Sequence, residues 1–202
     1  MKTIENLKTY GLIAILFLGI TLTSCNNDDD EIPDAENHEE IITNVKLIFT
    51  PTTGAVVEAR AQDPDGEGLE ELEILDEITL AADTDYTLTF EIMNNLEEPG
   101  EDIGKEINEE ADEHQIFFGF TTDAFSTPTG TGNISGSSTI NYLDFDENQN
   151  PLGLQTSWST GTGTQAGEFT VRLQHQPDIK DDTTGATDGD TDFELTFVLN
   201  IQ

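Results

Sequence analysis

His114 and His175 are the two histidines of the patterned part of the chain, and each is followed by glutamine. His114 opens segment 114–120, in which it shares a face with every second, apolar residue. His175 closes segment 169–175 and shares a face with the apolar residues there. If the two segments are antiparallel neighbours, the imidazoles meet, because directly opposed side chains have Cβ atoms about 5 Å apart. Two imidazoles at that separation could bind one divalent cation.

Carboxylates beside the two histidines could complete a metal site, since Glu113 precedes the first and Asp178 follows the second. Two imidazoles with a carboxylate suit Zn²⁺, or Cu²⁺ in a tetragonal arrangement. Alternatively, both histidines are structural residues at the rim of the core, hydrogen-bonded to the backbone. A shared Zn²⁺ requires ring nitrogens within roughly 5 Å of each other, because each lies about 2.0–2.1 Å from the ion.

Three loops carry acidic or amide side chains at alternate positions, a spacing whose oxygens can converge on Ca²⁺. The alternative is an ordinary Asx turn, in which the side chain bonds the nearby backbone. None of the loops combines the glycine at position six and the glutamate at position twelve of an EF-hand. The three sets are Asp63, Asp65 and Glu67; Asp144, Asp146 and Asn148; and Asp188, Asp190 and Asp192.

Cys25 is the only cysteine, and it ends a short apolar stretch near the start of the chain. Lys2 and Lys8 place positive charge ahead of residues 11–22, which are apolar but short of the roughly 20 residues that span a bilayer. Residues 22–25 read Leu-Thr-Ser-Cys. This arrangement resembles a bacterial lipoprotein signal, which is cleaved before a cysteine that then carries acyl chains.

The resemblance implies a signal peptide at residues 1–24, lipidation of Cys25 and an acidic, disordered tether at residues 25–42. The acidic run at residues 27–31 resembles the export signal of Bacteroidota lipoproteins, which implies attachment to the outer membrane, facing the cell exterior. The chain is similar to accessory lipoproteins encoded beside TonB-dependent receptors, which implies an outer-membrane receptor as partner. A lipidated Cys25 is unavailable for a disulfide, a thiolate metal site or nucleophilic catalysis.

The charge of the chain restricts its partners. It has 42 acidic and 7 basic residues, a formal net charge of −35 at pH 7. Nucleic-acid recognition needs clustered lysine and arginine, so this composition excludes it. Cations, basic surfaces and neutral ligands remain as partners.

From residue 43 onward, apolar and polar residues alternate with the period of half-buried β-strands. About nine short strands without alternating helices predict an all-β domain at residues 43–202. We expect an antiparallel β-sandwich of immunoglobulin-like or related Greek-key topology. The clearest alternation covers residues 45–50, 86–93, 169–174 and 193–202, and weaker alternation covers 55–61, 73–80, 114–120, 139–145 and 154–160.

Residues 102–113 interrupt the strand pattern. Ile103, Ile107 and Ala111 are four apart, which places them on one face of a helix. We therefore expect one short helix, inserted between two strands, over one end of the sandwich.

No enzyme motif stands out: the sequence has no Gly-x-Ser-x-Gly elbow, P-loop, dinucleotide fingerprint or His-Glu-x-x-His. The prediction is a lipid-anchored binding module, not an enzyme, that captures a divalent metal or another ligand for an outer-membrane receptor. The alternative is a structural or adhesive surface module that contacts a protein or glycan without metal. Glycoside hydrolysis by a carboxylate pair is a further alternative, but among 42 acidic residues no single pair is informative.

Overall fold

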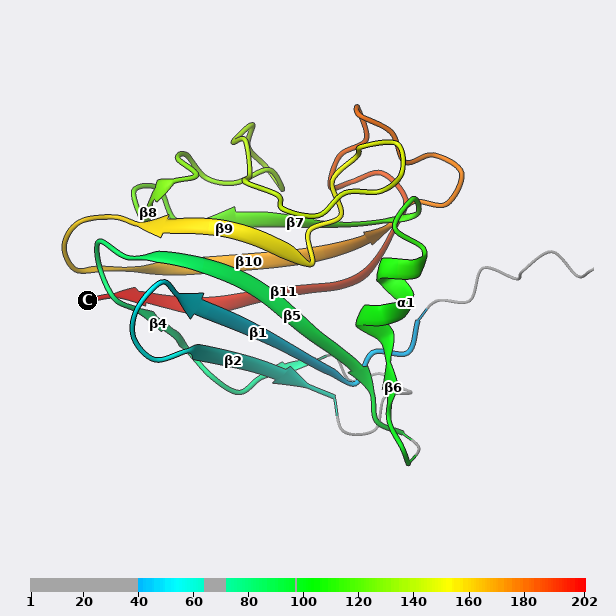
Figure 1. Ribbon diagram of the computed structural model, residues 1–202, viewed down its shortest axis with the longest axis horizontal. Helices are drawn as coiled ribbons and strands as arrows, with labels where there is room; N and C mark the ends of the chain where they lie inside the picture. Colours follow the sequence, from blue (N-terminus) through cyan, green and yellow to red (C-terminus); the bar gives the residue numbers. More distant parts are fainter. Residues whose placement is uncertain (1–39, 64–71, 97) are drawn as a thin grey trace, which may run out of the picture. The chain divides into compact units, whose positions relative to one another are not determined.

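Two β-sheets pack face to face in the computed structural model, which describes residues 40–63, 72–96 and 98–202 (Figure 1). The predicted all-β sandwich is confirmed. The expected signal peptide, Cys25 and most of the tether lie outside the described residues, as do Asp65 and Glu67. The elements are β1 (Asn44–Pro51), β2 (Val57–Gln62), β3 (Glu73–Ile74), β4 (Ile78–Leu80), β5 (Asp85–Asn94), β6 (Glu101–Asp102), α1 (Ile103–Glu109), β7 (His114–Phe120), β8 (Phe125–Thr127), β9 (Gln155–Thr160), β10 (Gln165–His175) and β11 (Asp190–Ile201).

The larger sheet has the strand order β3-β2-β1-β5-β9-β8, with β6 paired to β5, and the smaller sheet has the order β4-β11-β10-β7. Neighbouring strands are antiparallel except at one edge, where β4 runs parallel to β11. The expectation of a purely antiparallel sandwich is corrected there. The exception arises because the chain leaves the larger sheet after β3 and enters the smaller one at β4 beside the last strand.

The core lies between the sheets and is built by the strand alternation. Trp158 is fully buried at its centre. Its ring centroid lies 4.8–5.5 Å from those of four phenylalanines, Phe118, Phe120, Phe125 and Phe169. Each aromatic pair of this kind adds about 0.5–1.5 kcal/mol to the free energy of burying the rings. The single tryptophan therefore stabilises the core and presents no face to solvent.

Two strand predictions are wrong. Residues 139–145 form a loop with isolated bridges, because the Asp144 carboxylate accepts the backbone N–H groups of Gly153 and Gln155 that a ladder would use. Residues 73–80 form two short strands, since the chain crosses from one sheet to the other between them. The two- and three-residue strands β6 and β8 were not predicted, because segments so short show no periodicity.

Helix α1 lies across one end of the sandwich, as predicted (Figure 1). The Asp102 side chain caps it by accepting the backbone N–H of Lys105, and Ile103 and Ile107 are buried against the core. The helix ends at Glu109, earlier than predicted, because the chain turns there toward β7. Across the three described ranges, no helix has the length and hydropathy required to span a bilayer.

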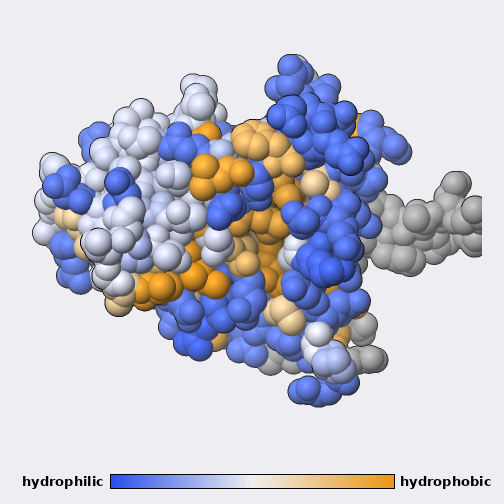
Figure 2. Space-filling model, viewed as in Figure 1, coloured by the Kyte–Doolittle hydropathy of each residue, from blue (hydrophilic) through white to orange (hydrophobic). Residues whose placement is uncertain are grey.

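Strongly hydrophilic side chains cover the end that carries α1, and they also occur in smaller groups among the weakly polar and apolar residues of the face shown (Figure 2). The loop that joins β10 to β11 also lies at the α1 end (Figure 1). His114 is the first residue of β7 and His175 is the last residue of β10, and both lie beside these elements. The candidate ligands therefore lie at an end of the sandwich whose surface is strongly hydrophilic.

Candidate metal centre

His114 and His175 face each other across two neighbouring strands. β7 and β10 are antiparallel, and their register pairs these two residues directly. The imidazole rings stack, with centroids 4.4 Å apart and planes 5° from parallel. Relative exposure is 0% for His114 and 5% for His175. The structure thus brings together the two side chains that the strand parity placed opposite each other.

The two histidines close the end of the hydrophobic core. One position further in on the same face, Ile116 of β7 pairs with Leu173 of β10, and both are fully buried. The imidazoles continue this row of core-facing side chains and take the position that a further apolar pair would occupy. Buried polar rings at such a position need partners for their nitrogens.

Glu40 provides a carboxylate that the sequence had assigned to the tether. Its Oε1 lies 2.9 Å from His114 Nε2, and its side chain is 9% exposed. Two contacts fix the chain beside it: Ile42 joins the core, and the Thr43 hydroxyl donates to the carbonyl of Met93. The pair Ile41-Ile42 was the signal for this contact, because two consecutive apolar residues mark the point where the chain meets the domain.

Glu40, His114 and His175 form a cluster that could hold a metal ion, the one such group found among the described residues. Each offers one ligand atom, and these three atoms all lie within 4.8 Å of one another. This separation satisfies the limit of roughly 5 Å between ring nitrogens that a shared ion requires.

The tautomer of His114 follows from its second nitrogen. Nδ1 lies 3.2 Å from the carbonyl oxygen of Glu110, which can only accept, so Nδ1 carries a proton. Nε2 of the neutral ring then presents a lone pair toward Glu40. Nε2 and Glu40 Oε2 are both buried without an aligned hydrogen-bond partner among the described residues. A lone pair and a carboxylate oxygen repel each other unless a proton or a metal ion lies between them.

The pKa shifts of Glu40 and His114 likewise favour a positive charge on the imidazole beside an ionised carboxylate. Burial disfavours the charged form of both groups, and alone it would raise the pKa of Glu40 and lower that of His114. The contact and charge interaction between them outweigh burial, so the pKa of Glu40 is lowered and that of His114 is raised. Asp192, on β11, adds a smaller contribution that also raises the pKa of His114.

The two carboxylates predicted as ligands lie further out. Glu113 Oε2 is 3.4 Å from His175 Nε2, and the side chain is 39% exposed, so it lies at the edge of the cluster. Asp178 is exposed in the turn after β10 and does not belong to the Glu40, His114 and His175 cluster. Its backbone adopts a φ of +62°, which directs the chain away from the strand end.

Metal binding by both imidazoles would require a rearrangement of the observed cluster. Ligand atoms around a tetrahedral Zn²⁺ lie roughly 3.3 Å apart, given bonds of about 2.0–2.1 Å. The lone pairs lie in the planes of their rings, and two parallel planes share no point on which both lone pairs could converge. Binding by both imidazoles therefore needs one ring to rotate about χ2 and the cluster to contract from 4.8 Å.

The second calcium-like loop uses its acidic oxygens internally. Asp144 accepts two backbone N–H groups, as described above. Asp146 is buried and accepts both the backbone N–H and the side-chain amide of Asn150. It also lies 3.4 Å from the fully buried ammonium of Lys180. Asn148 is exposed in the turn. This is the bonding of an Asx turn with a buried cation beside it.

Of the other two calcium-like sets, the one that begins at Asp63 is only partly described, and the one that begins at Asp188 continues along β11. Asp63 is buried at 6% exposure at the end of β2, and its two partners in the motif lie outside the described residues. Asp188 accepts the N–H of Gly185 in a turn. Asp190 and Asp192 follow as residues of β11.

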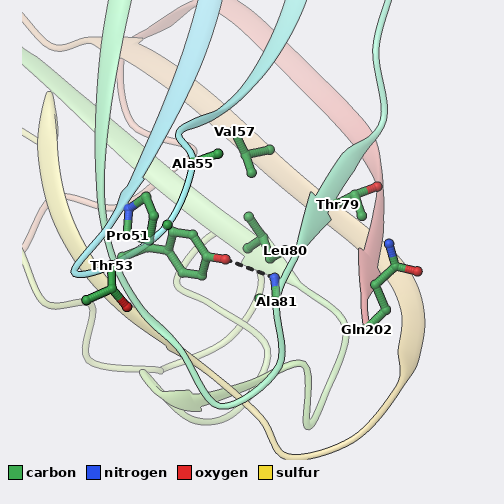
Figure 3. Close-up of a pocket in the computed structure, with 10 residues that line it drawn as sticks. Pro51, Thr53, Ala55, Val57, Thr79, Leu80, Ala81 and Gln202 are labelled. Atoms are coloured by element: carbon green, nitrogen blue, oxygen red, sulfur yellow. Dashed lines mark hydrogen bonds between the residues drawn. The ribbon is translucent and has the colours of Figure 1, made fainter.

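A separate pocket of about 330 Å³ opens between the β1–β2 turn and β4 (Figure 3). Its walls are mainly apolar, including Pro51, Val57 and Leu80, and the Tyr86 hydroxyl accepts the backbone N–H of Ala81. No charged side chain lines this pocket among the described residues. It offers no ligand set for a metal.

No family model, curated protein or solved structure matches this chain.

Proposed function

We propose that this protein binds a divalent transition metal ion, Zn²⁺ or Cu²⁺, through Glu40, His114 and His175. The observation that carries the proposal is that one ligand atom from each of these residues lies within 4.8 Å of the others at the end of the core. Two nitrogen ligands and one oxygen ligand suit these ions better than Ca²⁺ or Mg²⁺, which prefer oxygen.

The surroundings of His114 support the same role. A metal-binding histidine commonly donates its second N–H to a carbonyl or carboxylate, which orients the ring and holds the lone pair toward the ion. His114 has this arrangement, with the Glu110 carbonyl as acceptor. Glu113, which is partly exposed beside His175, is placed to serve as a fourth ligand or as a hydrogen-bond partner of a metal-bound water.

We further propose that the domain acts as a binding module on a membrane-attached chain. The Leu-Thr-Ser-Cys sequence at residues 22–25 supports a lipid on Cys25, and the acidic run after it supports display on the cell exterior. A module of this kind would capture the ion and present it to an outer-membrane receptor.

Thermal unfolding of the full chain in detergent solution tests metal binding. A ligand present at 100 times its Kd stabilises the folded state by about 2.7 kcal/mol. For a domain of this size, that stabilisation raises Tm by roughly 5–10 °C. We expect Zn²⁺ or Cu²⁺ to produce this increase and EDTA to reverse it.

The double variant His114→Ala/His175→Ala should lose the increase. The control is Glu58→Gln, which removes an exposed carboxylate from β2 and should keep it. An unchanged Tm for the unmodified chain with saturating metal would refute the proposed function.

A further inference from the structure

A second candidate site lies on the outer face of the smaller sheet. Phe117 of β7 is 3% exposed, yet it does not belong to the core between the sheets. Side chains alternate along a strand, so Phe117 points away from the core, opposite to Ile116 and Phe118. It forms part of the lining of a cleft of about 420 Å³ between residues 138–145 and 181–185. Ligand pockets typically measure about 300–1,000 Å³.

One wall of the cleft is held by the edge of β7. The Tyr142 hydroxyl donates to the carbonyl of Ile116 at 2.8 Å. Asn133 accepts the backbone N–H of Phe118 and donates to the Tyr142 hydroxyl at 2.9 Å. These bonds fix the loop that carries Tyr142 and Phe145 before any ligand arrives.

The opposite wall is held by Arg172 and Gln174, near the end of β10, and by Gln176, which directly follows the strand. Arg172 Nη1 donates to the carbonyl of Ala186 at 2.7 Å, and Gln176 donates to that of Gly185 at 3.0 Å. Gln174 donates to the carbonyl of Asp188 at 3.0 Å. A cleft whose walls are already bonded to the sheet loses little conformational entropy on binding.

The two walls differ in chemistry. Phe145, at 49% exposure, and Tyr142 offer aromatic surface on the first wall. Asp181 and Asp182 lie on the second, and no basic side chain lines the cleft among the described residues. Hydrogen bonds from Thr183 keep the pKa of Asp181 below its ordinary value, so this carboxylate is charged at neutral pH.

The basic residues nearest in sequence do not neutralise this wall. Lys180 immediately precedes Asp181, but its ammonium is fully buried, 3.4 Å from Asp146, and donates to the carbonyl of Ala111. Arg172 is paired with Glu194. The cleft therefore combines two negative charges with an aromatic surface, in a chain of net charge −35.

We propose that this cleft binds an organic cation, a guanidinium or ammonium group on an apolar stem. The carboxylates attract the charge, and the face of an aromatic ring attracts both the cation and its stem. An arginine or lysine side chain of a protein and a free amine or guanidine share this chemistry. The site does not depend on the metal centre, because Gln115, which lines the cleft, points to the face opposite His114.

The test is a titration of the metal-free, ¹⁵N-labelled full chain in detergent solution, followed by NMR. The probes are the blocked peptide Gly-Arg-Gly, the same peptide with neutral citrulline in place of arginine, and butylguanidinium. We expect the arginine peptide to shift the amide signals of residues 138–145 and 181–185, and the citrulline peptide to leave them unchanged. Tighter binding of the peptide than of butylguanidinium identifies a protein side chain as the source, and equal binding identifies a free cation.

Variants separate the contribution of the aromatic ring to binding from that of the two carboxylates. Phe145→Ala should weaken arginine-peptide binding about two- to fivefold, the range of an exposed cation–π contact. Asp181→Asn/Asp182→Asn should weaken it roughly four- to tenfold, because two partly exposed charge contacts are lost. The control, Glu58→Gln/Glu73→Gln, removes two exposed charges from the other sheet and should leave affinity unchanged.

Thermal unfolding of each variant establishes that it is folded before binding is compared. Equal binding of the citrulline peptide would overturn the proposal. So would an equal loss of affinity in the Glu58→Gln/Glu73→Gln control, which would mean that net charge alone attracts the probe.

Discussion

Nε2 of His114 lies 2.9 Å from Oε1 of Glu40, and the two residues are separated by more than seventy positions in the chain. The contact joins the segment ahead of β1 to the start of β7, and both side chains are almost entirely buried. Because the other nitrogen of His114 donates to Glu110, the space between the two groups needs a proton or a metal ion.

Zn²⁺ affinity should depend more on Glu40 than on Glu113. Glu40 is a member of the ligand cluster, whereas Glu113 lies at its exposed edge. Loss of even an outer-shell partner commonly weakens metal binding about 10–100-fold, so Glu40→Gln should weaken it by at least about tenfold. Glu113→Gln should have a smaller effect. Isothermal titration calorimetry measures both, and an affinity of Glu40→Gln equal to that of the unmodified chain would remove Glu40 from the ligand set.

The metal-free Glu40–His114 pair should stabilise the fold most at mildly acidic pH. The pKa of Glu40 falls below its ordinary 4.5 on folding, so its contribution is present above 4.5 and is lost as pH falls through the folded pKa. The pKa of His114 rises above its ordinary 6.5, so its contribution is full below 6.5 and is lost as pH rises through the folded pKa. Both contributions coincide between about pH 4.5 and 6.5.

Urea unfolding in the presence of EDTA measures this dependence. The difference in free energy of unfolding between the unmodified chain and His114→Gln should be largest inside that window and should shrink on either side. A difference that does not vary with pH would show that the pair is not ionised in the folded state.

Gly189 should be needed for the loop to pass His175. A Cβ on Gly189 would lie 2.1 Å from the carbonyl oxygen of His175, and its φ is +81°. Gly163 has a similar φ of +92° but nothing within 4 Å of its Cβ position, which makes Gly163→Ala a matched control. The control should lose about 1–2 kcal/mol of unfolding free energy from left-handed backbone alone.

Gly189→Ala should lose about 2–5 kcal/mol, since displacing packed backbone adds about 1–3 kcal/mol to the conformational cost of about 1–2 kcal/mol. Urea denaturation compares the two variants. Similar losses would mean that the loop moves freely away from His175.

The buried pair of Lys180 and Asp146 should behave as a unit. Burial lowers the pKa of Lys180 in spite of the nearby carboxylates, so the ammonium depends on its partners to stay charged. Lys180→Met or Asp146→Asn alone should destabilise the fold by about 3–5 kcal/mol, because the remaining group is left buried without its partner. The double variant should lose clearly less than the sum. A double-mutant cycle by urea unfolding measures the coupling, and additive losses would contradict it.

Much of the fold could be read from the sequence. Alternation with period two identified β7 at its observed bounds, because successive side chains of any strand point to opposite faces. The same rule placed His114 on the core face of one strand and His175 on the core face of another. The four-residue spacing of Ile103 and Ile107 identified α1 in the same way, since it reflects the helical repeat.

The full set of residues in each site could not be predicted from strand or helix periodicity. Nothing local to Glu40 indicates a histidine at position 114, because the contact arises from the pairing of β1 with β5 and from the packing of α1 on β5. Phe117 looked like one more alternating residue of a strand, and only the loops packed over it make it the floor of a cleft. The acidic loop at residues 144–150 suggested calcium, yet a lysine thirty positions later lies beside its Asp146 carboxylate.

The sequence by itself determined the elements, the faces of their side chains and the acidic character of the surface. These properties depend on backbone geometry and composition within a few residues. The tertiary structure decided which side chains share a site, because Glu40, His114 and His175 meet only after distant strands have packed. The histidine pair was foreseeable from strand parity, but the carboxylate that completes the cluster depended on the course of the whole chain.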